Sequence, residues 1–140
     1  MTELIPINPA ALGAPRGYSN GIRVSAERDT LHVAGQIAFD GDQAIVGVGD
    51  FVRQFEQALA NFLAVVSEAG GGASDVASMT IYVTDRSAYL AAVPALGSVW
   101  KRHMGRHYPA MALVAVAALV EAEAMVEIQG VAALAAGEGS

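Results

Sequence analysis

An unbroken apolar run near the C-terminal end constrains the fold of this chain more than any other feature. Residues 110–120 carry no charge, and almost every position up to Leu119 is apolar. A helix that crosses a membrane needs about 20 such residues, so the run is too short to span a bilayer. We therefore expect a β-strand over residues 110–119, with both of its faces covered by other parts of the structure.

A second apolar strand is expected over residues 124–132, joined to the first across residues 120–123 as a hairpin-like pair. Glu127 is a lone carboxylate within this strand, and in such surroundings a carboxylate needs solvent or a partner. Two interpretations stay open. Glu127 lies on the exposed side of an edge strand, or it lies in a cleft, where it can orient a water molecule or accept a proton.

Two helical segments precede these strands. Asp50 can cap a helix whose apolar side chains share one face and which ends at Gly70–Gly72. That face comprises Phe51, Phe55, Leu59, Phe62, Leu63 and Val66. A second helical region follows Asp85. Because Pro94 lies inside it, we expect a short turn and then a helix that starts near Pro94 and stops at Gly105.

The remaining segments complete an α+β pattern. Strands are expected over residues 22–25, 31–37 and 77–84, with a turn at 27–29 between the first two and a loop over 39–49. Residues 1–21 are expected to form an irregular arm, and residues 135–140 a disordered tail. The order β-β-α-β-α-β-β predicts a single domain over residues 1–140, with two helices on one face of a mixed sheet.

The composition indicates how the other sheet face is covered. Of the 140 residues, 54% are hydrophobic and only 16% are charged, which is more apolar surface than one small globule easily hides. We therefore expect burial between subunits. The net charge of −6 argues against binding to nucleic acid. Without cysteines or a signal-like N-terminus, the chain is expected in the cytoplasm and away from membranes.

The three histidines do not predict a metal site. His103 and His107 are four residues apart, a spacing that can place two ligands on one helical face. Gly105 lies between them and is expected to end the helix, and no third ligand is obvious. We interpret both as surface histidines at a helix end, and His32 as a half-exposed residue of a strand.

Six short segments occur in the order and spacing of a known protein family. They are Arg16-Gly17-Tyr18-Ser19, Ala34-Gly35-Gln36-Ile37, Gln54-x-x-Gln57-Ala58-Leu59-x-Asn61, Thr80-Ile81-Tyr82-Val83-Thr84-Asp85, Tyr108-Pro109-Ala110 and Val126-Glu127-Ile128. Together they resemble the RidA family (reactive intermediate deaminase, or YjgF) over residues 15–134. The resemblance implies a chorismate-mutase-like fold and a homotrimer that binds a small molecule in three clefts between adjacent subunits.

The resemblance also implies a reaction. Family members hydrolyse reactive imines and enamines, such as 2-aminoacrylate, to a keto acid and ammonia, without a cofactor or metal. In that mechanism a tyrosine and a glutamate flank a water molecule, and Tyr18 and Glu127 match these positions. Gly35 matches a glycine of the site, and main-chain groups near Gly35 and Gln36 are expected to help position the substrate.

Three positions depart from the family pattern. Met111 stands where an arginine holds the substrate carboxylate, Ala34 where a serine is usual, and Val93 where an asparagine is common. A thioether cannot replace the charged, bidentate pairing of arginine, so the cleft is expected to be more apolar. Arg16 or Arg106 could restore the missing charge, although neither lies at the motif position.

Three functions are therefore weighed. The first is cofactor-free hydrolysis or tautomerisation of an enamine or imine other than the usual amino-acid-derived ones. The second is a trimer that binds a ligand without turnover. The third is a 2-iminoacid deaminase that uses a displaced arginine. Endoribonuclease activity gains no support from the negative charge.

Overall fold

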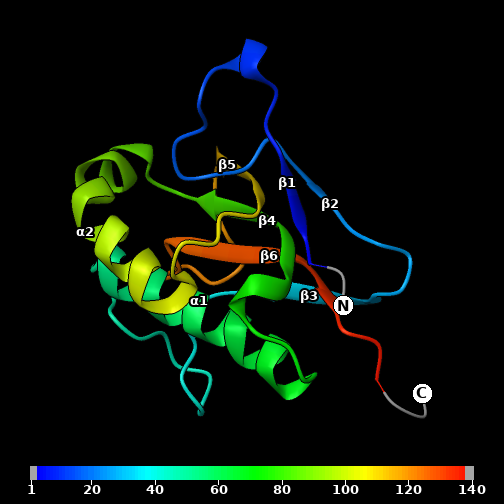
Figure 1. Cartoon of the computed structure of the whole chain (residues 1–140). Helices are drawn as coiled ribbons and strands as arrows, with labels where there is room; N and C mark the ends of the chain where they lie inside the picture. Colours follow the sequence, from blue (N-terminus) through cyan, green and yellow to red (C-terminus); the bar gives the residue numbers. More distant parts are fainter. Residues whose placement is uncertain (1–2, 138–140) are drawn as a thin grey trace.

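Two helices cover one face of a four-stranded mixed sheet, and no helix of the described chain covers the other face (Figure 1). The structure is a computed structural model that describes residues 3–137. The elements of this layer are β3 (Asp29–Gln36), α1 (Phe51–Glu68), β4 (Val76–Val83), α2 (Arg86–Met104), β5 (Ala110–Ala115) and β6 (Val126–Leu134). This arrangement confirms the predicted α+β class and the order of helices and strands.

Helix α1 forms as its sequence predicts. The Asp50 carboxylate accepts a hydrogen bond from the Arg53 backbone N–H (3.1 Å), which caps the first turn. The helix ends before Gly70, whose φ of +92° suits glycine. Its apolar stripe forms the core with side chains of the sheet, and Leu59, Phe62 and Val66 are fully buried.

The predicted hairpin of the last two strands is wrong. In the sheet order β3-β6-β4-β5, strand β4 lies between β5 and β6. The β4–α2–β5 crossover places β5 parallel to β4, and β6 then pairs antiparallel with β4 on the other side. A crossover helix allows parallel neighbours, whereas a hairpin allows only antiparallel ones.

Strand β5 is shorter and less covered than its composition predicts. It ends at Ala115 and forms an edge of the sheet, so one of its long sides pairs with β4 and the other lies at the sheet edge. Val114 is 41% exposed and Val120 fully exposed. The apolar residues of β5 are thus not all buried within one chain, and cover of both faces of this strand stays a prediction that needs another subunit.

The arm is more regular than expected. Strand β1 (Ile5–Ile7) pairs antiparallel with β2 (Gly21–Arg23), and a 3₁₀ turn, η1 (Ala10–Leu12), lies between them. The Asn8 side chain helps to close this loop by accepting a hydrogen bond from the Asn20 N–H at 2.7 Å. β2 therefore belongs to a separate two-stranded sheet and does not pair with β3.

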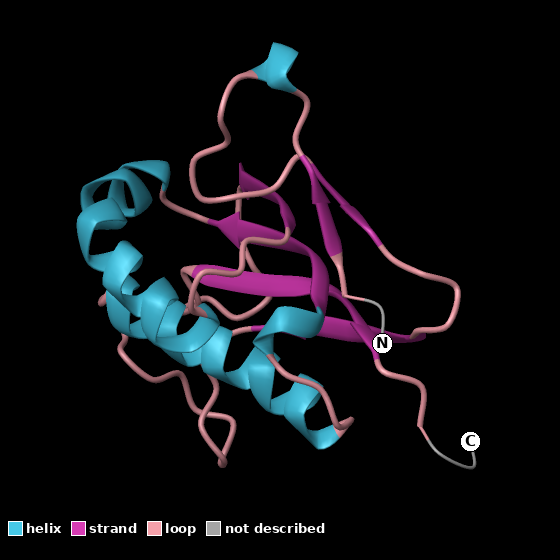
Figure 2. Ribbon diagram, viewed as in Figure 1, coloured by secondary structure: helices cyan, strands magenta, loops and turns pink. Residues whose placement is uncertain are grey.

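Helix α2 continues through Pro94 and does not begin near it. The Asp85 carboxylate caps the helix by accepting from the Ala88 N–H at 3.0 Å, and Gly105 ends it as predicted. Proline removes one backbone donor and crowds the preceding turn, but Pro94 is exposed, so water can satisfy the freed carbonyl. The ribbon of α2 bends in its N-terminal half (Figure 2), as proline kinks do.

The remaining short elements add little to the site. A second 3₁₀ turn, η2 (Ala73–Asp75), leads into β4. Residues 135–137 follow β6 without regular structure, and the rest of the predicted tail lies outside the described residues, as do residues 1–2 of the predicted arm.

Candidate functional site: a cavity between α2 and β5

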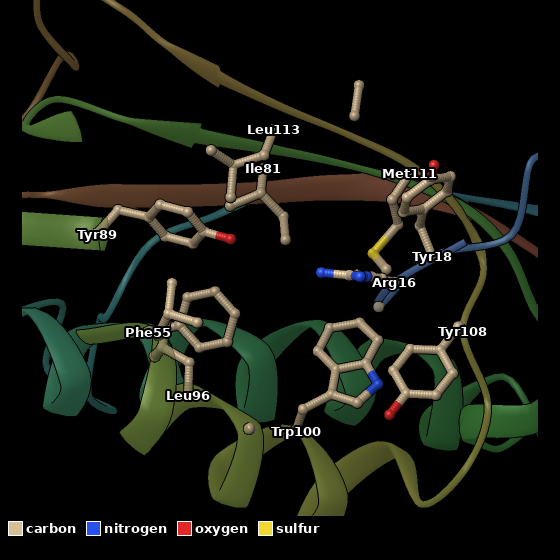
Figure 3. A pocket seen from close by; sticks show the side chains of 14 residues that line it. Arg16, Tyr18, Phe55, Ile81, Tyr89, Leu96, Trp100, Tyr108, Met111 and Leu113 are labelled. Atoms are coloured by element: carbon tan, nitrogen blue, oxygen red, sulfur yellow. The ribbon is translucent and has the colours of Figure 1, made fainter. Parts of the chain in front are cut away.

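A cavity of about 340 Å³ lies between α2, the edge strand β5 and the arm. Small-molecule sites commonly have this size, with mostly apolar walls and a few polar groups. The lining residues labelled in Figure 3 are Arg16, Tyr18, Phe55, Ile81, Tyr89, Leu96, Trp100, Tyr108, Met111 and Leu113. Gly17, Val93, Gly97 and Ala112 complete the wall.

The arm reaches this cavity because Ser19 is fastened to the start of β5. The Ser19 backbone N–H donates to the Pro109 carbonyl (2.9 Å), and its hydroxyl donates to the Tyr108 carbonyl (2.6 Å). Ser19 is buried, with 6% of its surface exposed. These bonds hold Arg16 and Tyr18 beside Met111, more than ninety positions away in the sequence.

Aromatic side chains form much of the cavity wall. The Trp100 and Tyr108 rings stack with centroids 5.9 Å apart and planes 7° apart. The Trp100 indole N–H donates to the His107 carbonyl at 3.1 Å, which fixes the ring. Tyr89 meets Phe51 edge-on, with centroids 6.2 Å apart. Such contacts leave a preformed apolar wall.

Glu127 lies on the other face of the sheet. Its neighbours Val126 and Ile128 are fully buried in the core under the helices, and side chains alternate along a strand. Glu127 is therefore directed to the helix-free face, as is Tyr82, its cross-strand partner on β4. On the same face, the Tyr82 hydroxyl donates a hydrogen bond to the Gln129 side-chain oxygen at 3.0 Å. β6 is an inner strand, so Glu127 does not lie on an edge strand.

Gly35 lies directly against Glu127. A β-bulge between Val33 and Gln36 leaves Ala34 and Gly35 without cross-strand partners, and bulges often occur beside functional sites. A Cβ on Gly35 would overlap the Glu127 carboxylate, with Cδ at 2.8 Å. The Gln36 amide donates to the Ala34 carbonyl at 3.1 Å, so it braces this turn of the bulge.

The predicted site residues therefore form two groups within one chain. Tyr18, Val93 and Met111 line the cavity. Ala34, Gly35, Gln36 and Glu127 gather at the β3–β6 pair, with β4 between Glu127 and β5. The two groups do not meet within the chain.

Apart from Tyr18, the aromatic residues of the cavity were not predicted as site residues. Tyr89, Leu96 and Trp100 lie in the predicted helical region after Asp85, and helical spacing alone cannot separate a core residue from a cavity wall. Of the two arginines considered as replacements, Arg16 lines the cavity and Arg106 does not.

Two polar residues of the family-like helix segment hold loops to the helix. Fully buried Gln54 donates to the Gly47 and Glu123 carbonyls (3.1 and 3.0 Å) and accepts from the Met125 N–H at 2.8 Å. The Asn61 amide donates to the carbonyls of Ile37 and Phe39, both at 2.9 Å. Both are structural residues that shape the ends of β3 and β6.

The histidines near the end of α2 also have structural partners. His103 Nε2 lies 2.8 Å from the Glu56 carboxylate, and His107 Nε2 lies 2.7 Å from the Val76 carbonyl. Within residues 3–137, no group of three or more His, Asp or Glu side chains could hold a metal ion. In the same part of the chain, no helix combines the length and apolar character needed to cross a membrane.

Comparisons with known proteins agree with this geometry. The family model described as endoribonuclease L-PSP matches residues 8–134. The crystal structure of YyfB from Yersinia pestis, a protein of unknown function of the conserved Rid protein family, aligns with a TM-score of 0.84 and 32% identity. That match covers 95% of this chain and all of YyfB.

Two curated relatives extend the comparison. The RutC family protein y4sK of Sinorhizobium fredii is 34% identical over 134 residues, which is 96% of this chain and 99% of that protein. The 3-aminoacrylate deaminase RutC of Acinetobacter baylyi is 28% identical over 120 residues, covering 86% of this chain and 91% of RutC.

Proposed function

Since the chain belongs to the endoribonuclease L-PSP family, also called Rid or YjgF, we propose that it hydrolyses an enamine or imine in clefts between the subunits of a homotrimer. The relative named as a 3-aminoacrylate deaminase supports this class of reaction. The proposal needs no cofactor or metal ion. We also propose a cytoplasmic location, which agrees with a chain that has no cysteine.

The split between the two groups of site residues is the observation that carries the proposal. Met111 faces the cavity beside α2, whereas Glu127 is directed to the helix-free face. A second copy that covers the helix-free face would bring its own Tyr18 and Met111 toward Glu127. It would also cover the apolar positions of β5, including Val114.

The chemistry requires a group that handles protons beside a water molecule. Glu127 would take a proton from water as the oxygen forms a bond to the imine carbon. The same carboxyl group would then return that proton to nitrogen, which gives a carbinolamine. In a second transfer through Glu127, the hydroxyl proton of the carbinolamine would move to nitrogen, so that the C–N bond breaks, the C=O bond forms and ammonia leaves. Tyr18, at the mouth of the cavity, would close the site and position this water.

The cavity disfavours a polyanionic substrate. Among residues 3–137, Arg16 is the only basic residue that lines it, and the chain carries a net charge of −6. Cleavage of RNA needs several cations to hold phosphates. The apolar wall instead supports a small substrate with an apolar body.

The proposal is tested with a panel of imines that amino-acid oxidases generate in the presence of semicarbazide. The wild-type protein should lower semicarbazone formation for imines with apolar side chains, and Glu127→Gln should abolish the effect. If no imine of the panel is hydrolysed but a ligand still binds, the proposed reaction is wrong and the protein binds its ligand without catalysis.

Met111→Arg tests whether the cavity determines the substrate. A guanidinium at this position can pair with a small carboxylate, so we expect hydrolysis of 2-iminopropionate to rise by at least about tenfold. Met111→Leu is the matched control, because it keeps the volume without adding charge, and it should not increase that activity.

A further inference from the structure

We propose that Arg16 binds the carboxylate of a ligand whose aromatic or bulky aliphatic body fills the cavity between α2 and β5. This inference rests on the proposed function, because it names the substrate class of the same site. For the proposed hydrolysis, the inference predicts that the substrates are 2-imino acids with large apolar side chains.

The position of Arg16 supports an anionic partner. Figure 3 shows its guanidinium reaching into the cavity, between the Trp100 side and the Met111 side. In the part of the chain that the structure describes, no acidic residue lines the cavity. Within residues 3–137, Arg16 forms no hydrogen bond or ion pair. A guanidinium directed into an apolar space gains most from a carboxylate, which can accept two parallel hydrogen bonds.

The backbone around Arg16 is held in place. Ser19 is fastened to β5 by two hydrogen bonds, and Gly17 adopts a φ of +76°, a conformation that glycine takes easily. The Arg16 side chain therefore projects into the cavity from an arm that is anchored to β5. A cation presented in this way can meet a carboxylate without refolding of the arm.

The wall of the cavity supports an apolar ligand body. Trp100 and Tyr108 stack on one side, and Leu96, Ile81 and Leu113 supply aliphatic surface. A small acid such as propionate would pair with Arg16 but leave this surface uncovered. A ring or branched chain of the same acid would cover it, which favours the larger ligand.

Trp100 provides a direct measurement, because it is the only tryptophan in the chain and it lines the cavity. The probes are 3-phenylpropionate, its neutral amide 3-phenylpropanamide, and propionate, titrated while Trp100 fluorescence is recorded. We expect 3-phenylpropionate to bind at least about tenfold more tightly than either of the others. Equal affinity for the acid and its amide, or no binding of the acid, would overturn the proposal.

Arg16→Gln removes the charge at an exposed residue and should not affect folding. It should weaken binding of 3-phenylpropionate by about 10- to 100-fold and leave binding of the amide unchanged. Arg16→Lys should retain part of the affinity. Arg106→Gln is the matched control, since Arg106 is exposed and does not line the cavity, and it should leave binding intact. Equal losses in both glutamine variants would contradict a specific role for Arg16.

These titrations involve no turnover, so they separate this inference from the proposed function. Binding that depends on Arg16 without imine hydrolysis would refute the reaction and keep the ligand class. Hydrolysis with no preference for the acid would refute the ligand class and keep the reaction.

Discussion

Because Gly35 has no side chain, the Glu127 carboxylate can lie directly against its backbone. The space that a Cβ would occupy is already filled by the carboxyl end of Glu127, with Cγ at 3.0 Å and Cδ at 2.8 Å from that position. A glycine here is thus explained by close approach of a neighbouring side chain. Its φ is not in the left-handed region.

Gly35→Ala should displace Glu127 without harming the fold. Glu127 is partly exposed and flexible, so it can rotate away at a cost below about 1 kcal/mol of unfolding free energy. A carboxylate moved by about 1 Å should lower imine hydrolysis by roughly 100-fold. Steady-state turnover and thermal unfolding measure the two effects. Full activity in Gly35→Ala would show that the position of Glu127 is unimportant.

Gly130→Ala is the contrasting control. Its Cβ would meet the Ser78 carbonyl and lie 3.1 Å from the Met79 Cα, and backbone atoms of an inner strand cannot move aside. We expect this variant to lose about 1–3 kcal/mol of stability.

The sequence could single out individual candidate residues but could not predict their surroundings. Glu127 was identified because a lone carboxylate in an apolar strand is unusual. Gln54 and Asn61 belong to a family-like segment, yet their hydrogen bonds show that they hold loops. Neither bond was predictable, since each joins segments more than twenty residues apart.

At the scale of elements, an ionic cluster joins the two helices. The Glu56 carboxylate of α1 lies 2.8 Å from both Arg102 Nη2 and His103 Nε2 of α2. Hydrogen bonds from Arg102 and then His103 lower the pKa of Glu56 below its usual value of 4.5, against a smaller opposing effect of burial. The cluster therefore favours the ionised carboxylate in the folded state.

The lowered pKa predicts how stability changes with pH. Folding stabilises ionised Glu56, so this contribution is complete well above pH 4.5 and is lost as the pH falls through the lowered pKa. Glu56→Gln should reduce the unfolding free energy at pH 7 by at most about 1 kcal/mol, because solvent screens this cluster. The difference from wild type should vanish in strong acid. Thermal unfolding across this pH range measures it.

Glu121→Gln is the control for general charge effects, because this exposed loop carboxylate takes part in neither salt bridge of α2. It should change stability little at either pH. A Glu56→Gln deficit that persists in strong acid would indicate lost packing and contradict the electrostatic account.

Local pattern predicted the types of element well and their pairing poorly. The cap at Asp50 and the stop at Gly105 are local signals, and the structure bears them out. The pairing of β5 with β4 is set by the α2 crossover, which hydrophobic spacing does not encode. The predicted helix start near Pro94 was wrong for a related reason. The free-energy cost of a proline inside a helix depends on whether that side of the helix is exposed to water.

At the scale of the whole molecule, the two groups of predicted site residues face different ways. If they form one site, as we propose, the cavity group and the Glu127 group meet only when two copies associate, with one covering the helix-free face of the other. Closed rings of identical subunits satisfy this need, because every interface then repeats the same pair of surfaces. The sequence of a single chain could not reveal this division, since both groups carry family-like motifs.

A mixing experiment tests this division directly. Gly97→Leu should fill the cavity, because among the described residues no atom beyond the neighbouring residues and backbone of α2 lies within 4 Å of a Cβ placed on Gly97. Glu127→Gln should remove the carboxylate. Each variant alone should be inactive. After the two are unfolded together and refolded in equal amounts, a cleft is intact only where an unmodified cavity meets an unmodified Glu127. In a closed ring this holds for about a quarter of the clefts, so about a quarter of wild-type hydrolysis should return. No recovery in ring assemblies that contain both variants would mean that each cleft is built from one chain.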